Sequence, residues 1–142
     1  MTDSLSSQER SERMSRIRGK DSAPEIRLRR LVHKLGYRYR LHVKELPGTP
    51  DLVFPSRRAV IFMHGCFWHR HEGCKLARLP KSKLDFWKKK LDSNKNRDAL
   101  QQQRLYELGW RVLVIWECEL DDADRLVMTI RKFLDEPTRG QS

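Results

Sequence analysis

The sequence predicts an α/β domain whose elements follow the order α-β-β-β-α-β-α around a mixed sheet flanked by helices. Four short runs are rich in β-branched and aromatic residues, and longer runs repeat apolar residues at helical spacing. Turns containing glycine or proline separate these runs. The chain of 142 residues is long enough to bury one core, so a single domain is expected over residues 23–136.

The first helix is expected between residue 22 and Gly36, where glycine supplies a C-terminal stop. Asp21 or Ser22 can cap its N-terminus. Pro24 suits the first turn, and the carboxylate of Glu25 complements the helix dipole there. Apolar residues recur at helical spacing in this segment: Leu28, Leu31, Val32 and Leu35.

Three strands are expected next. Tyr37, Tyr39 and Leu41 alternate with arginines, which is typical of a half-buried strand. The turn LPGTP precedes a second strand that starts at Asp51. After a further turn, PSRR, the run AVIFMH is a third and strongly apolar strand.

The second half of the chain begins with a loop, residues 65–81, that shows no periodicity. Two helical runs follow, at about residues 84–91 and 94–108. The run WRVLVIWE at residues 110–117 is a strand rich in β-branched residues. An amphipathic helix at residues 121–134, with an acidic first turn, closes the domain.

The chain is strongly basic, with 30 Lys and Arg against 19 Asp and Glu, a formal charge of +11. A folded domain this basic most often binds a polyanion, first of all nucleic acid and second an anionic membrane. There is no apolar run of membrane-spanning length and no apolar signal core, so a cytosolic protein is expected. Residues 1–22 are expected to form a flexible arm with Met14 and Ile17 as its apolar anchors.

The cysteines are three in number, which argues against a disulfide framework and favours free thiols or metal ligation. A C-x4-H-x2-C spacing in the loop, with a third cysteine after the late strand, suits a closed tetrahedral zinc site of structural type. Two alternatives are that Cys118 is a buried thiol, or that His64 or His69 takes the place of His71 as the ligand. The candidate zinc ligands are Cys66, His71, Cys74 and Cys118.

Asp51 opens a strand, and the next strand is expected to run antiparallel to it. Many nucleases place a magnesium-binding acid there, with a second acid and a lysine on the following strand. That strand reads Ile61, Phe62, Met63, His64 and lacks such a motif. Backbone carbonyls, water and substrate phosphate would therefore have to complete a magnesium site. The alternative is an aspartate that only ends a turn.

Two histidines, His64 and His69, flank the candidate zinc ligands and could act as general acid or base. Asp98 on the following helix could hold the second nitrogen of one ring. Glu25 is a further candidate for polarising the site. For each of these residues alone, a surface or capping role is the alternative.

Aromatic residues amid lysines suit a surface on which rings stack on bases or wedge between them. Phe67 and Trp68 are adjacent and in most backbones cannot both enter one core, and Trp87 follows within a lysine-rich run. The alternative is that Phe86 or Trp87 packs the helix on the sheet. Two further tryptophans are expected in the core: Trp110 and Trp116.

Together, the segments LPGTPDLVF, VIFMHGCFWHRHEGC and LGWRVLVIWECEL resemble the bacterial very short patch repair endonucleases, over about residues 8–135. The resemblance implies a restriction-endonuclease-like core. It also implies an enzyme that recognises the T·G mismatch left by deamination of 5-methylcytosine and nicks the DNA 5′ of the mismatched thymine. Mg²⁺ would be catalytic and Zn²⁺ structural. A bacterial cytoplasmic, nucleoid-associated monomer without a membrane partner is expected, with a MutL-type repair protein as a candidate partner.

The resemblance also implies roles for individual residues. Asp51 would bind magnesium together with the main-chain carbonyl of Met63. His69 would be the catalytic histidine, with Asp98 as its carboxylate partner. His64 and Glu25 would be auxiliary residues of the active site. The zinc ligands would be Cys66, His71, Cys74 and Cys118. The residues inserted into the DNA would be Phe67, Trp68 and Trp87, with Met14 and Ile17 in the arm that contacts the opposite groove. Two other readings are a zinc-stabilised DNA-binding module without activity, and a nuclease of the same core with another substrate.

Overall fold

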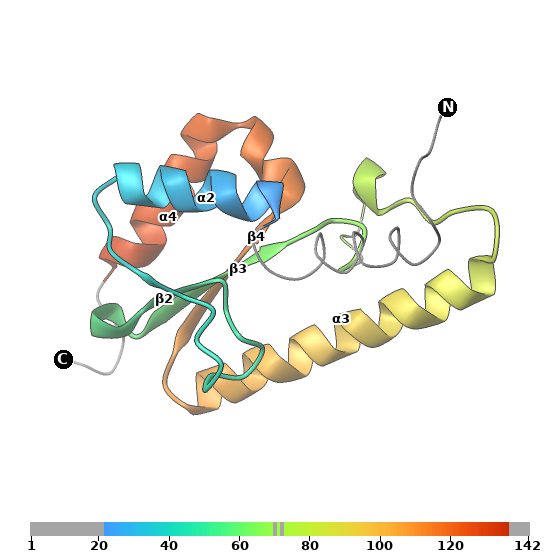
Figure 1. Cartoon of the computed structure of the whole chain (residues 1–142), viewed down its shortest axis with the longest axis horizontal. Coiled ribbons are helices and arrows are strands. Elements are labelled where there is room, and N and C mark those ends of the chain that lie inside the picture. Colours follow the sequence, from blue (N-terminus) through green and yellow to red (C-terminus); the bar gives the residue numbers. More distant parts are fainter. Residues whose placement is uncertain (1–21, 70, 72, 137–142) are drawn as a thin grey trace, which may run out of the picture.

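The computed structural model describes residues 22–69, 71 and 73–136, arranged as one sheet between two layers of helices (Figure 1). The helices are α2 (Ala23–Lys34), α3 (Leu84–Glu107) and α4 (Ala123–Asp135). The strands are β1 (Arg40–Leu41), β2 (Leu52–Phe54), β3 (Ala59–His64) and β4 (Arg111–Trp116). This order, α-β-β-β-α-β-α, confirms the prediction.

The sheet is mixed, with the strand order β1-β2-β3-β4. β1 and β3 each run antiparallel to β2, whereas β4 runs parallel to β3 along its whole length. The parallel crossover from β3 to β4 contains the loop and α3, as such a connection requires. In this register His64 lies beside Trp116, so both aromatic side chains are at the C-terminal ends of the two longest strands.

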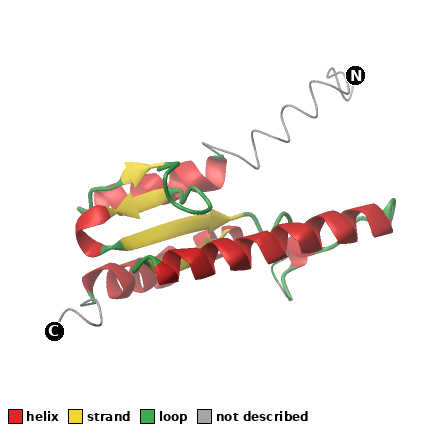
Figure 2. Cartoon of the chain, turned by 90° about the horizontal axis from the view of Figure 1, so that it is seen from below, coloured by secondary structure: helices red, strands yellow, loops and turns green. Residues whose placement is uncertain are grey.

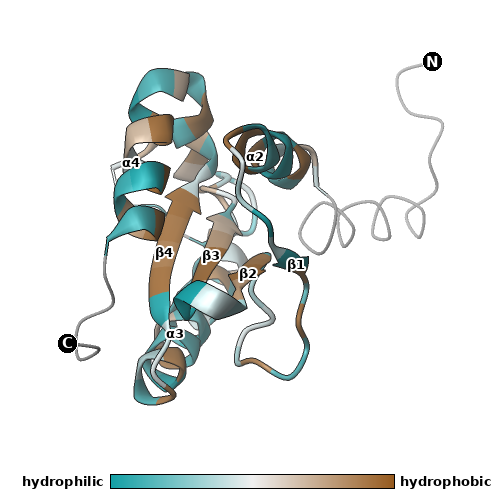
Figure 3. Cartoon of the chain, turned by 90° about the vertical axis from the view of Figure 1, so that its left-hand side faces the viewer, coloured by the Kyte–Doolittle hydropathy of each residue, from teal (hydrophilic) through white to brown (hydrophobic). Residues whose placement is uncertain are grey.

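Side chains alternate between the two faces of the strands and divide the core in two. One face, with Ile61 and Ile115 at its centre, packs against α2 and α4. The other, with Val60 and Phe62, packs against Leu105 near the C-terminal end of α3. Figure 3 shows the apolar strands between the two helical layers, and Figure 2 shows α3 extending past the sheet at its N-terminal end. The site develops along that second, less covered face.

Helix ends follow the local sequence. Ser22 caps α2, with its hydroxyl accepting from the Glu25 backbone N–H at 3.4 Å. Asp122 caps α4 in the same way through the backbone N–H of Arg125 at 3.1 Å. Gly36, which ends α2, has φ +100°, a left-handed conformation that favours glycine. None of the described helices is both long and apolar enough to cross a bilayer.

Two expected elements differ from the structure. The two helical runs of the second half are a single helix of 24 residues, α3, because the polar segment around Asn94 stays helical. The first strand is limited to Arg40–Leu41. Tyr37 instead packs in the α2–α4 core and donates a hydrogen bond to Asp135 at 2.8 Å. The loop also contains a short 3-10 helix, Lys75–Ala77.

Candidate active site and metal centre

The Cys/His cluster forms where the loop after β3 folds back against the end of β4. The ligand atoms of its four residues all lie within 4.8 Å of one another, and His71 Nδ1 is 3.5 Å from Cys118 Sγ. A tetrahedral zinc bound by thiolates at about 2.3 Å has ligand atoms about 3.8 Å apart, so the donor set fits zinc. The cluster brings together all four predicted ligands: Cys66, His71, Cys74 and Cys118.

Local backbone geometry wraps this loop around the cluster. The His71 N–H donates to the Cys66 carbonyl at 3.0 Å, and the Cys74 N–H donates to the His71 carbonyl at 3.3 Å. Gly73 has φ +72°, which lets the chain turn sharply between His71 and Cys74. The short spacing read from the sequence is therefore what closes three of the four donors into one turn.

The pKa values of the three cysteine thiols are shifted by burial and by neighbouring groups in the cluster. Burial, ahead of interactions with Cys118 and Cys74, raises the pKa of Cys66 to about 12. The backbone N–H of Leu76 lowers the pKa of Cys74, while burial raises the pKa of Cys118. A bound divalent cation would stabilise all three thiolates and release their protons. The cluster can therefore bind zinc, and with four protein donors it leaves no open coordination position for chemistry.

A second cluster joins His64, His69 and Asp98 across the less covered face of the sheet. His69 Nδ1 is in hydrogen-bond contact with Asp98 Oδ2 of α3. Because an ionised carboxylate can only accept, this contact assigns the Nδ1 proton and leaves Nε2 of neutral His69 as the basic nitrogen. The pair has the arrangement that general-base catalysis requires.

His64 has a different environment from His69. Its ring is buried and stacks on that of His69, with centroids 3.8 Å apart and planes 5° apart. Burial, followed by the neighbouring His69, lowers the pKa of His64 to about 3. Among the described residues, no group forms a hydrogen bond with its Nδ1. His64 is therefore a neutral ring held by packing, whereas His69 is held by a carboxylate.

The third cluster surrounds Asp51 at the start of β2. Asp51 Oδ2 accepts a hydrogen bond of 2.6 Å from the Met63 backbone N–H, which places the carboxylate beside the main chain of β3. Glu25 of α2 is buried, and its Oε2 lies 3.0 Å from His42 Nε2 and accepts a bond of 3.0 Å from Arg29 Nε. Ligand atoms of Glu25, His42 and Asp51 lie within 4.8 Å of one another.

Two carboxyl groups close together and shielded from water are costly to ionise. Burial, with a smaller contribution from the adjacent Glu25, raises the pKa of Asp51 to about 8 against the lowering effect of the Met63 N–H hydrogen bond. A divalent cation favours the ionised form of such a pair, and carboxylate oxygens are the ligands that Mg²⁺ prefers. The donor set at Asp51 therefore fits a hard divalent cation.

A single cavity of about 470 Å³ joins the second and third clusters. Its lining includes His42, Asp51 and Met63 from the third cluster and its neighbourhood, and His64, His69 and Asp98 from the second. An adjoining cavity of about 450 Å³ is also lined by His64, His69 and Asp98 and includes His71 and Trp116. A group bound in the first cavity would thus have access to both the Asp51 carboxyl and the His69 imidazole.

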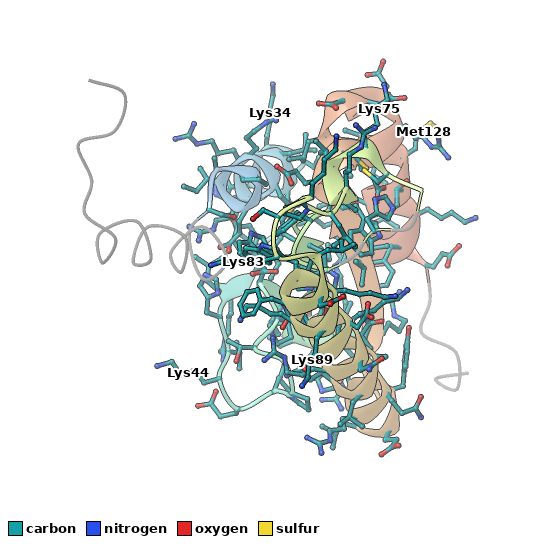
Figure 4. All side chains as sticks on the ribbon, turned by 90° about the vertical axis from the view of Figure 1, so that its right-hand side faces the viewer. Lys34, Lys44, Lys75, Lys83, Lys89 and Met128 are labelled. Atoms are coloured by element: carbon teal, nitrogen blue, oxygen red, sulfur yellow. The ribbon has the colours of Figure 1, made fainter. Side chains whose placement is uncertain are left out.

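The aromatic cluster comprises Phe67, Trp68 and Trp87, the last from α3. Ring centroids lie 5.0 Å apart for Phe67 and Trp68, 5.5 Å for Phe67 and Trp87, and 6.0 Å for Trp68 and Trp87. The rings belong to neither core cluster and remain partly exposed. Exposed lysines belong to the same loop and helix, including Lys75, Lys83 and Lys89, which are labelled in Figure 4. Phe86, which contacts Trp87, is 57% exposed and does not pack on the sheet.

The structure also shows what sequence reasoning missed. His42 lies in a run without any motif, and only the fold brings it to Glu25 and Asp51. Trp116 was expected in the core, yet its ring lines the cavity beside the histidines. Trp110, also expected in the core, is half-buried and does pack against the core cluster on the α3 face, with the Arg58 guanidinium 4.4 Å from its ring. The predicted arm residues Met14 and Ile17 lie outside the described residues.

The chain is similar to known DNA endonucleases. The family model "DNA mismatch endonuclease Vsr" matches residues 2–75. The Type II nicking enzyme V.XorIIP of Xanthomonas oryzae pv. oryzae is 52% identical over 135 residues, which cover 95% of this chain and 98% of that protein. The DNA mismatch endonuclease Vsr of Escherichia coli is 44% identical over 117 residues, which cover 82% of this chain and 74% of that protein.

A solved structure with low sequence identity has a similar fold. The "Homing Endonuclease I-Bth0305I Catalytic Domain" superposes with a TM-score of 0.54 at 23% identity, covering 80% of this chain and 94% of that one. This likeness concerns the fold alone, and it confirms the predicted restriction-endonuclease-like core. With the family match over half of the chain and relatives this similar over nearly its whole length, the chain belongs to the Vsr family of DNA mismatch endonucleases, a family of strand-nicking enzymes.

Proposed function

We propose that this endonuclease cuts one DNA strand on the 5′ side of the thymine in a T·G mismatch left by deamination of 5-methylcytosine, in a reaction that requires Mg²⁺. The observation that carries the proposal is the shared cavity, whose lining includes both Asp51 and the His69–Asp98 pair. The aromatic cluster on the same loop supports a mismatched substrate. The family resemblance supplies the T·G pair and the position of the cut.

In the proposed mechanism, Asp51 and the Met63 main-chain carbonyl would hold Mg²⁺, with Glu25 acting through water. When bound, the ion orients the attacking water and offsets the negative charge that develops on the phosphate. His69 Nε2 accepts a proton from that water, while Asp98 keeps the ring in the required tautomer and orientation. His64 supports the face of the His69 ring and, being neutral, adds no competing charge.

Recognition would use the rings of Phe67, Trp68 and Trp87. Insertion of apolar rings between base pairs costs a few kcal/mol of stacking, and a mismatched pair costs less to separate than a matched one. The difference favours insertion at the lesion. Exposed lysines of the same loop and helix would contact the phosphates, and residues 1–22, with Met14 and Ile17, are proposed to clamp the opposite groove.

Cutting of one strand needs one active site, so we propose a monomer that acts on chromosomal DNA in the bacterial cytoplasm. A MutL-type repair protein is the candidate partner for the step that follows. The alternative function, a DNA-binding module without activity, is supported by the absence of an E-x-K motif on β3. It gives no reason for a histidine–carboxylate pair in the cavity.

The test uses two synthetic duplexes that differ only in carrying T·G or T·A at one position, with Mg²⁺ and a denaturing gel to detect nicks. We expect a nick beside the thymine of the T·G duplex and little cutting of the T·A duplex. Asp51→Asn, which keeps the size of the side chain, should abolish nicking and preserve binding. No nick in either duplex would refute the enzyme, and equal cutting would refute mismatch specificity.

The Cys/His cluster is proposed to bind one structural zinc ion. Cys118→Ser should reduce the zinc content well below one ion per chain and lower the melting temperature, because metal binding to such a set contributes directly to folding. Elemental analysis and thermal melts measure the two effects. Thr129→Ser on α4, at a residue outside the Cys/His cluster, is the control. Full zinc content and an unchanged melting temperature in Cys118→Ser would contradict the assignment.

A further inference from the structure

Trp116 links two clusters that the proposed function treats separately. One face of its indole stacks on His71 of the Cys/His cluster, with ring centroids 4.1 Å apart and planes 7° apart. The ring also packs in edge-to-face contact with His64, at 5.2 Å and 78°, and lies 6.5 Å from His69. His64 in turn stacks on His69. Rings therefore form a continuous series from the candidate zinc ligands to the candidate general base.

The position of His64 depends on these rings. Among the described residues, no group forms a hydrogen bond with its buried Nδ1, so packing rather than hydrogen bonding at that atom holds the imidazole. Phe62 contacts it at a centroid distance of 5.7 Å, His69 covers one face, and Trp116 meets it across the β3–β4 register. If the indole were lost, one of these three supports would go, and His64 and the stacked His69 would gain freedom to tilt.

Trp116 is itself fixed from the side of the Cys/His cluster. Its backbone N–H donates to Glu119 Oε1 at 3.0 Å, and Cys118 follows it by two residues. His71, which stacks on the indole, is 3.5 Å from the Cys118 sulfur. Binding of a metal by His71 and Cys118 would therefore hold the indole both through its stacking partner and through its own backbone.

We propose that Trp116 is a positioning residue for the nicking reaction. The Cys/His cluster fixes the position of its indole, and the indole in turn restricts the orientation of the His64 and His69 rings. The indole does not line the cavity that contains Asp51, and it acts only through the two imidazoles. The proposal rests on the proposed role of His69 as general base. The Cys/His cluster would then have a second role besides stability, because the fixed positions of the zinc ligands would determine the orientation of His69 in the adjoining cavity.

The experiment compares Trp116→Phe and Trp116→Leu with Trp110→Leu, which removes an indole from the other end of β4. Each zinc-loaded variant is tested for single-turnover nicking at saturating mismatch DNA, for Kd, and for zinc content. A misplacement of about 1 Å can cost about 100-fold in rate. We expect about a 10- to 100-fold loss for Trp116→Leu, a smaller loss of about 3- to 10-fold for Trp116→Phe, and less than about a twofold change for Trp110→Leu. Kd and zinc content should be unchanged.

A readout independent of activity is the NMR signal of each histidine ring. Loss of the indole ring current shifts these resonances in any case, so the informative quantity is line width: the ring resonances of His64 and His69 should broaden in the Trp116 variants, whereas those of exposed His33 should not. A merely structural tryptophan would lower the melting temperature and leave both the rate of the folded fraction and these line widths unchanged. A rate within twofold of wild type with unbroadened resonances overturns the proposal, and Trp116→Phe decides it if Trp116→Leu does not fold. Normal nicking by His69→Ala would instead refute the proposed function.

Discussion

The two faces of the sheet are built differently. The face toward α2 and α4 buries thirteen residues of one apolar cluster, whereas the face toward α3 buries four, among the described residues. Both cavities of the site open on the α3 side, where the N-terminal part of the helix runs past the sheet (Figure 2). Stability is thus concentrated on one face. The other accommodates the buried imidazole of His64, a group that a fully packed core would exclude.

The largest expected effect is on the α3 face and concerns rate. His69→Ala should lower the single-turnover nicking rate by about 10² to 10⁴, the usual contribution of a general base, with little loss of stability. Rapid-quench assays and thermal melts measure the two quantities. His33→Ala, on the exposed side of α2, is the matched control. A loss of stability as large as the loss of rate would remove the distinction between the faces.

The second effect is on the α2–α4 face and concerns stability. Leu28 is fully buried on α2, so Leu28→Ala should reduce the free energy of unfolding by about 2–5 kcal/mol. Leu100 is 52% exposed on α3, and Leu100→Ala should change it by less than about 0.5 kcal/mol. Urea titration gives both values. Rates per folded molecule should be unchanged, and similar destabilisation by the two variants would contradict the comparison.

The third effect is a dependence of stability on pH. The pKa of Asp51 is raised to about 8 by burial, above its value in the unfolded chain. The stability that this group provides is therefore complete below the unfolded pKa, near 4, and is lost as pH rises toward 8. In magnesium-free buffer, Asp51→Asn should lose less melting temperature than wild type between pH 5 and pH 8.

Comparison of the two proteins isolates Asp51, because both retain His64. The pKa of His64 is lowered to about 3, so it acts in the opposite direction and costs stability as pH falls below its unfolded value, near 6.5. Plots of melting temperature against pH for wild type and Asp51→Asn should therefore differ mainly at the alkaline end of the range. Parallel curves from pH 5 to pH 8 would show that the carboxyl is not held in its protonated form by the fold.

Much of the fold could be predicted from local patterns. The strand Ala59–His64 has the predicted bounds because its apolar run is bordered by turns. The continuity of α3 could not be predicted, because the polar residues near Asn94 interrupt its apolar stripe. In the structure Asn94 donates to the Trp68 carbonyl at 3.3 Å and accepts from Arg97, so tertiary contacts satisfy it within the helix.

The site shows the same division. Spacing predicted the Cys/His cluster, because three of its donors lie within nine residues of one loop. Trp116 was misjudged because a tryptophan in an apolar strand usually enters the core, and only the β3–β4 register turns its ring toward the histidines. His42 gave no signal, since nothing in its neighbourhood indicates that α2 and β2 will bring carboxyl groups to it.

The sequence by itself determined the order of the elements, the helix caps, the loop donors and the basic character of the chain, because each depends on residues close together or on composition. Tertiary structure alone decided which groups share a cavity. Asp51, His69 and Asp98 come from β2's start, the loop and α3, and their proximity follows from strand pairing and helix packing. Their altered chemistry has the same origin. Exclusion of water raises the pKa of Asp51 and lowers that of His64, and only the folded chain excludes water.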